Sequence, residues 1–176
     1  EPITLEVVSW KLAEEIEEDE SYSMVSMVSV ATDDELRGAG AEYSGFVRDH
    51  YLQLPSDTPQ RVRQLARDLT RDAETPFDKA IAVQDYLRGP DFTYSRRSEV
   101  PPRDADGVDH FLFETRAGYS AYFASSMAVL LRSVGVPTRV AAGYAPGLYD
   151  RESGVTVVRD SDGHGWGQVY FPEYGW

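Results

Sequence analysis

The chain is 176 residues long, 41% of its residues are hydrophobic, and its formal net charge is −13. This length and composition predict a globular protein with its own core. The chain contains no cysteine, which excludes disulfides, thiolate-bound zinc and thiol redox chemistry. No apolar stretch approaches the roughly 18 residues that a membrane-spanning helix needs. The acidic balance, without a basic stripe, disfavours a nucleic-acid partner.

The first 35 residues carry most of the negative charge. They contain eleven acidic residues and one basic residue, whereas residues 36–176 carry a net charge of only −3. Residues 4–12 and 22–30 alternate in polarity and predict two strands of a hairpin, joined by an acidic run at 14–20. Consecutive acids repel one another and lack ligand spacing, so we interpret the run as a solvated tip and not as a cation site.

Two helices are predicted in the middle of the chain. After a linker at 54–59, Thr58 and Pro59 have the pattern of an N-cap followed by a first helical residue. Thr75 and Pro76 repeat this pattern, and Gly89 ends the second helix. Apolar residues recur at helical spacing in both segments.

A third helix begins near Ser120 and ends at Gly135, with a proline just beyond it. The remainder predicts strands at 138–144, 155–158 and 166–171. Helices followed by strands predict an α+β domain whose central helix packs against an antiparallel sheet.

The candidate site combines Ser120 at the start of that helix with His164 further along the chain. The unpaired N–H groups and the dipole of a helix N-terminus favour negative charge. A cysteine placed there beside a histidine can have its pKa lowered to roughly 3.5–7.5, and the same N–H groups can stabilise an oxyanion. A third group then orients the histidine, and Asp162 is the possible auxiliary acid near His164.

Each of these residues also has a structural interpretation. A serine at a helix start is most often an N-cap, and a histidine between glycines is most often a turn residue. Residues 118–122 lack the last glycine of a hydrolase nucleophile elbow. Residues 160–171 have Phe171 where a calcium loop needs glutamate. We treat His50 and His110 as structural.

Several separate motifs, in order, resemble the bacterial membrane-anchored transglutaminase-like proteins. The resemblance runs from about residue 51 to residue 176. The segments that carry it are 76–80 (PFDKA), 86–88 (YLR), 109–113 (DHFLF), 118–125 (GYSAYFAS), 135–140 (GVPTRV), 164–166 (HGW) and 169–172 (VYFP).

The resemblance implies a papain-like α+β core at residues 57–176, truncated at its C-terminal side, after a hairpin-containing extension at 1–56. It implies acyl transfer on peptide or protein amides, no cofactor and no metal. It also implies an extracytoplasmic location and membrane spans elsewhere in the parent protein. The resemblance further implies that Ser120 and His164 are the catalytic residues. It implies that Gly118, Tyr119 and Trp166 form the cleft or oxyanion site.

Three departures separate the chain from this family. Ser120-Ala121 stands where the family has cysteine followed by glutamate, and residues 162–169 (DGHGWGQV) replace DAHAWVEV. The family's third catalytic residue, an aspartate, follows the position of Trp176. A hydroxyl must lose its proton to the base during attack, so serine predicts a weakly active or inactive site. The alternatives are a non-catalytic peptide-binding or scaffold module and, third, a true serine hydrolase.

Overall fold

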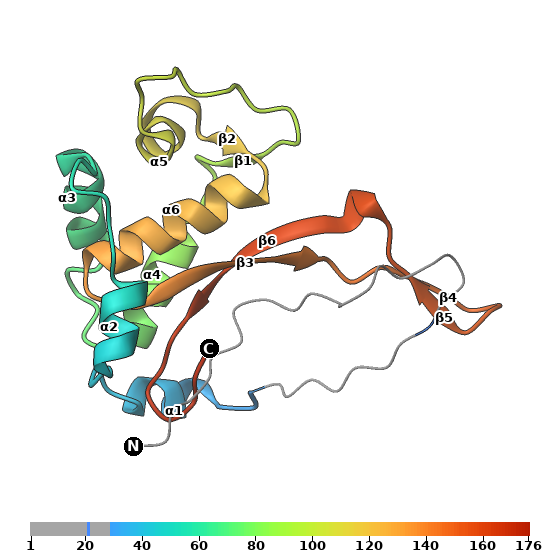
Figure 1. Cartoon of the computed structure of the whole chain (residues 1–176), viewed down its shortest axis with the longest axis horizontal. Coiled ribbons are helices and arrows are strands. Elements are labelled where there is room, and N and C mark those ends of the chain that lie inside the picture. The colour runs from blue at the N-terminus through green and yellow to red at the C-terminus, as the bar shows by residue number, and fades with distance from the viewer. Residues whose placement is uncertain (1–20, 22–28) are drawn as a thin grey trace.

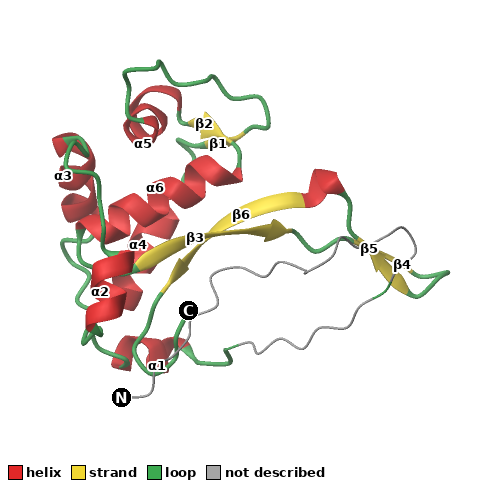
Figure 2. Ribbon diagram, viewed as in Figure 1, coloured by secondary structure: helices red, strands yellow, loops and turns green. Residues whose placement is uncertain are grey.

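The computed structural model describes Ser21 and residues 29–176 of the chain (Figure 1). The predicted N-terminal hairpin lies outside the described residues except at 29 and 30. Helices and strands are mixed along the chain (Figure 2). The helices are α1 Asp33–Gly38, α2 Gly45–Tyr51, α3 Gln60–Leu69, α4 Pro76–Leu87, α5 Gly107–His110 with a π-helical continuation Phe111–Thr115, and α6 Ser120–Ser133. The strands are β1 Thr93–Tyr94, β2 Ala117–Gly118, β3 Thr138–Tyr144, β4 Leu148–Asp150, β5 Val155–Val157 and β6 Gly163–Val169.

Local capping rules predict one helix start correctly and one incorrectly. The Thr75 side chain accepts a hydrogen bond from the Asp78 N–H and caps α4, with Pro76 as its first residue, as predicted. The predicted Thr58 cap is wrong, because Pro59 occupies the N-cap of α3 and has no side-chain cap hydrogen bond. The Thr58 hydroxyl instead donates to the Pro55 carbonyl at 2.7 Å, closing the turn before the helix.

The α+β architecture with a central helix on an antiparallel sheet is confirmed. Helix α6 packs against α3, α4, β3 and β6 (Figure 1). Strands β3 and β6 pair antiparallel over seven residues, from Thr138 opposite Val169 to Tyr144 opposite Gly163. The β3 bounds match the prediction, whereas β6 begins and ends earlier than predicted. Its glycines have low intrinsic strand preference, and pairing with β3 overrides that preference.

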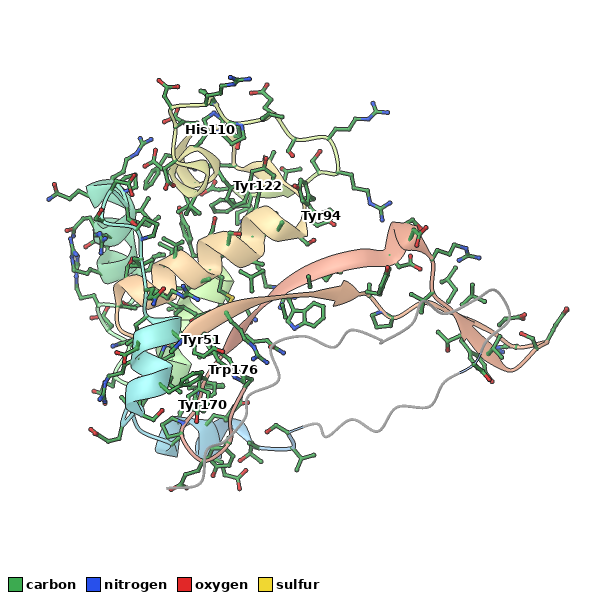
Figure 3. The ribbon with its side chains drawn as sticks, in the orientation of Figure 1. Tyr51, Tyr94, His110, Tyr122, Tyr170 and Trp176 are labelled. Atoms are coloured by element: carbon green, nitrogen blue, oxygen red, sulfur yellow. The ribbon has the colours of Figure 1, made fainter. Side chains whose placement is uncertain are left out.

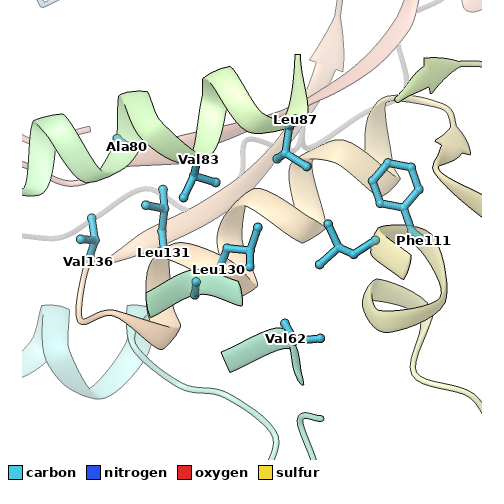
Figure 4. Close-up of a cluster of buried hydrophobic side chains, with 10 residues drawn as sticks. Val62, Ala80, Val83, Leu87, Phe111, Leu130, Leu131 and Val136 are labelled. Carbon is cyan, nitrogen blue, oxygen red and sulfur yellow. The ribbon is translucent and has the colours of Figure 1, made fainter. Parts of the chain in front are cut away.

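The main core surrounds α6 (Figure 4). Leu130 and Leu131 of α6 are fully buried, and they pack with residues from α3, α4 and the π-helical segment. The remaining members of this buried cluster are Val62, Ala66, Ala80, Val83, Leu87, Phe111, Leu112 and Val136. Burial of these side chains on all sides fixes the position of α6, and with it the position of Ser120 at its first turn.

A second, smaller cluster joins the N-terminal helices to the end of the chain. Tyr43, Val47 and Tyr51 are buried against Tyr170 and Trp176. Figure 3 shows Tyr51, Tyr170 and Trp176 together beside α2. An ion pair between Arg37 of α1 and Asp78 of α4 adds a link at 2.9 Å. Residues 33–51 therefore pack on the body of the domain.

Two short sheets complete the described part of the chain. Strands β1 and β2 form a parallel pair that precedes α6, and β4 and β5 form an antiparallel hairpin. In Figure 1 this hairpin extends beyond the far end of the β3–β6 sheet. Among the described helices, none has the length and hydropathy required to cross a membrane.

Candidate active site

Ser120 is the first residue of α6 and is buried, with 9% of its surface exposed. Tyr119 occupies the N-cap in an extended conformation and makes no side-chain cap hydrogen bond. Ser120 is therefore not the cap of its own helix. Its Oγ accepts a hydrogen bond of 3.1 Å from the Gly165 N–H of β6, which places the hydroxyl where the strand crosses the helix N-terminus.

The glycines of β6 set how closely the strand approaches α6. A methyl group at Gly165 would lie 3.8 Å from the Ser120 Oγ, and one at Gly167 would lie 3.2 Å from the Met127 Sδ. These positions therefore face α6. Side chains alternate along a strand, so His164 and Trp166 leave β6 on the opposite face. Their rings are stacked at a centroid distance of 6.5 Å.

Ser120 and His164 border one cavity of about 560 Å³. The described part of the chain shows no hydrogen bond between them, since the Gly165 N–H is the group that contacts the Ser120 Oγ. The cavity wall consists of residues from α4, β1, α6 and β6: Gln84, Leu87, Arg88, Tyr94, Ser120, Phe123, Ala124, Met127, His164, Gly165, Trp166 and Gly167. The structure thus brings together the two predicted catalytic positions and Trp166 without joining the first two by a hydrogen bond.

The hydrogen bonds of Asp162 within the described residues are made with Arg159 and Ala145, and none is made with His164. It ends a short 3₁₀ helix, Asp160–Asp162, immediately before β6. One carboxylate oxygen accepts a hydrogen bond from the Arg159 N–H at 2.8 Å, and its carbonyl accepts one from the Ala145 N–H at 2.8 Å. These contacts close the turn that leads into the strand.

Gly118 and Tyr119 directly precede Ser120, and neither is among the described residues that line its cavity. A side chain at Gly118 would lie 2.9 Å from the Tyr122 ring, so only glycine fits there without displacing that ring. Tyr119 is 43% exposed and contacts Tyr122 edge to face at 5.0 Å. Tyr119, Ala121 and Tyr122 line a second cavity of about 400 Å³. Tyr94 and Tyr122 both lie near this end of α6 in Figure 3.

The other two histidines lie outside both cavities. The His50 Nδ1 is 2.8 Å from the Phe46 carbonyl oxygen one turn earlier in α2, and His110 ends α5. No group of three histidine, aspartate or glutamate side chains suited to hold a metal ion occurs in the described ranges.

Sequence reasoning missed Gln84, Arg88, Tyr94 and Met127 as cavity residues. The helical period places Gln84 and Arg88 one turn apart. It does not indicate that this side of the α4 C-terminus shares a cavity with β6. Tyr94 reaches the cavity from a two-residue strand, which is too short for a polarity pattern to reveal.

The comparisons with known proteins identify the family of this chain. The model of the transglutaminase-like superfamily matches residues 63–176. The chain belongs to this superfamily. The family model begins in α3 and includes both Ser120 and His164.

Two curated relatives match most of the chain. The chain is 47% identical over 133 residues to an uncharacterised protein, YebA, of Bacillus subtilis, an alignment that covers 73% of the chain. It is 38% identical over 125 residues to a protein-glutamine gamma-glutamyltransferase of Pseudomonas aeruginosa, covering 71% of the chain. The chain spans 18% of the length of each of these relatives.

Solved structures show the same fold. The periplasmic domain of TgpA from Pseudomonas aeruginosa superposes with a TM-score of 0.68 at 36% identity, covering 77% of this chain and 46% of that one. A structure described as a putative cysteine protease from Cytophaga hutchinsonii gives a TM-score of 0.51 at 21% identity, covering 74% and 40% of the two chains. The second likeness concerns the fold alone. This chain is therefore a transglutaminase-like domain related to TgpA.

Proposed function

We propose that this domain binds a peptide or protein amide in the cavity at the N-terminus of α6, where Ser120 occupies the nucleophile position of an acyl-transfer site. The observation that carries the proposal is the position of the Ser120 Oγ. It is buried at the first turn of α6, hydrogen-bonded to β6, and beside a cavity that His164 also borders. The relation to a protein-glutamine gamma-glutamyltransferase supports a glutamine carboxamide as the acyl donor.

The chemistry follows from the helix terminus. In acyl transfer the nucleophile gives its proton to the base and adds to the carboxamide carbon. The C–N bond then breaks, and ammonia leaves with the proton that the protonated base returns. An amine or water then takes the acyl group and restores the nucleophile. The N–H groups at the start of α6 favour the negative charge that develops during the first step.

Serine makes this site weakly active or inactive. A thiol at a helix N-terminus ionises near neutral pH, whereas a hydroxyl must pass its proton to a base as it attacks. In the structure the Ser120 Oγ accepts a hydrogen bond from the Gly165 N–H and makes none with His164. The base would have to come into hydrogen-bond reach of the hydroxyl for turnover.

The proposed setting is extracytoplasmic. The TgpA structure to which this chain is similar is that of a periplasmic domain, and it covers 77% of this chain. We place the domain outside the cytoplasm on that basis, in a parent protein anchored by membrane spans elsewhere. A cell fractionation of the parent protein, with protease accessibility of this domain in spheroplasts, tests the location.

The activity is tested with Ser120→Cys. We expect the new thiol to have a pKa below about 7.5, measured as the pH dependence of its alkylation by iodoacetamide. We also expect incorporation of a fluorescent primary amine into a glutamine-bearing protein, lost in Ser120→Cys with His164→Ala. The Ser120→Ala variant is the control for background labelling.

A thiol with an ordinary pKa near 8.5 and no His164-dependent amine incorporation would contradict the proposal. Peptide binding without any transfer by the cysteine variant would instead support a non-catalytic module. Labelling of wild-type Ser120 by a fluorophosphonate would indicate a true serine hydrolase.

A further inference from the structure

Among the described residues that line the Ser120 cavity, Arg88 is the one arginine or lysine. It follows the last residue of α4, and the same wall includes Gln84, one helical turn earlier, and the exposed ring of Tyr94. Within the part of the chain that the structure describes, no aspartate or glutamate lines this cavity. Within the described ranges, none of the ion pairs involves Arg88.

Among the described residues, the contact that Arg88 makes does not require its charge. Its backbone N–H closes α4 by donating to the Gln84 carbonyl at 2.9 Å. A cation near a helix C-terminus gains a few tenths of a kcal/mol to about 1 kcal/mol from the helix dipole, and any position in the last turn provides this gain.

The positive charge of Arg88 is also opposite in sign to the net charge of the chain. Residues 36–176 carry a net charge of −3, so the overall field repels anions, and a cation at the cavity reverses that field locally. A guanidinium binds carboxylates through paired hydrogen bonds. The neighbouring apolar wall, with Phe123, Met127 and Trp166, suits the carbon skeleton of a substrate.

We infer that Arg88 makes this cavity selective for acyl substrates that carry a carboxylate close to the reactive amide, such as an acidic peptide. The inference rests on the proposed function insofar as Ser120 marks the reactive end of the cavity. It adds to that function a residue that determines which substrates enter.

The experiment compares two alkylating reagents of nearly equal size in the Ser120→Cys background. Iodoacetate carries a carboxylate and iodoacetamide does not, so the ratio of their rates of reaction with the introduced thiol reports the local charge without requiring turnover. We expect Arg88→Gln to lower the iodoacetate rate about three- to tenfold while the iodoacetamide rate stays constant. Arg88→Lys is expected to retain most of the ratio.

The matched control is Arg151→Gln, which removes the same charge from the exposed turn after β4, outside the cavity. It is expected to leave the ratio unchanged. Raising the salt concentration is expected to slow iodoacetate selectively when Arg88 is present, which tests the inference without altering α4.

Equal effects of Arg88→Gln on both reagents, or an equal loss in Arg151→Gln, would overturn the inference. The reagent ratio does not depend on amide turnover. A cysteine variant with charge selectivity but no amine incorporation therefore refutes the proposed activity and supports the role of Arg88. Turnover without charge selectivity supports the proposed activity and refutes the role of Arg88.

Discussion

Replacement of Tyr43 by phenylalanine tests how tightly the N-terminal helices are joined to the domain. The Tyr43 ring is buried in the cluster with Val47 and Tyr51, and it contacts Tyr170 edge to face at 6.4 Å. Its hydroxyl is buried and has no hydrogen-bond partner among the described residues. This burial raises the pKa of Tyr43 from 10.0 to about 12.

The pKa of Tyr43 in the folded and in the unfolded chain determines how pH changes the free energy of unfolding. Between pH 10 and pH 12 the unfolded chain loses the phenol proton while the folded chain retains it, so raising the pH favours unfolding. This pKa difference corresponds to a loss of about 1.4 kcal/mol in the free energy of unfolding at pH 11, and about 2.7 kcal/mol well above pH 12. Below pH 9, Tyr43→Phe removes only an unpaired hydroxyl and is expected to stabilise the fold by up to about 1 kcal/mol.

Urea unfolding of wild type and Tyr43→Phe at pH 8, 10, 11 and 11.5 measures this difference. Because all other tyrosines are present in both proteins, their titration cancels in the comparison. The stability gap is expected to widen by about 1.4 kcal/mol between pH 8 and pH 11. Parallel loss of stability in the two proteins would refute a buried Tyr43 hydroxyl and the packing of residues 43–51 on the domain.

Three substitutions near the site test its packing. Gly165→Ala adds a methyl group at ordinary contact distance from the Ser120 Oγ and is expected to stabilise the fold by about 0.5–1 kcal/mol in urea unfolding; destabilisation would show that the strand lies closer to α6. Gly118→Ala places a methyl group 2.9 Å from the Tyr122 ring and is expected to cost about 1–3 kcal/mol by the same measurement, and an unchanged midpoint would contradict this packing. Ala121→Glu supplies the acidic residue that the first turn of α6 lacks and is expected to raise stability by about 0.3–1 kcal/mol, with Ala121→Gln as the uncharged control in thermal melts.

Elements specified by local chemistry could be predicted from the sequence. The Thr75 cap and Pro76 start α4 because both act within one turn of the helix, and the β3 bounds follow from a run with strand preference. The start of α6 at Ser120 was also predictable, but not the identity of its cap. Thr58 has the same local pattern as Thr75, yet its hydroxyl is used by the preceding turn.

The cavity could not be predicted in the same way, because its walls come from segments far apart in the chain. The family motifs placed Ser120 and His164 at one site, and the structure brings them to one cavity. Arg88 enters that cavity only because α4 packs against α6 beside β6. The hydrogen bond from Gly165 to Ser120 likewise depends on tertiary approach, since the two residues are 45 positions apart in the sequence.

Serine at position 120 differs from cysteine in geometry as well as acidity. The Gly165 N–H occupies one lone pair of the Ser120 Oγ on the side of β6 that faces α6, while His164 leaves the strand on the other face. A hydroxyl needs the imidazole in contact at the moment of attack, so turnover by serine would require His164 to come within hydrogen-bond reach of the Ser120 Oγ. A thiolate formed in the field of the α6 N-terminus has already lost its proton before it attacks. Ser120→Cys should therefore gain reactivity toward iodoacetamide even if the distance to His164 does not change, because a thiolate needs no base during attack. Amine incorporation still needs His164 to give a proton to the departing ammonia.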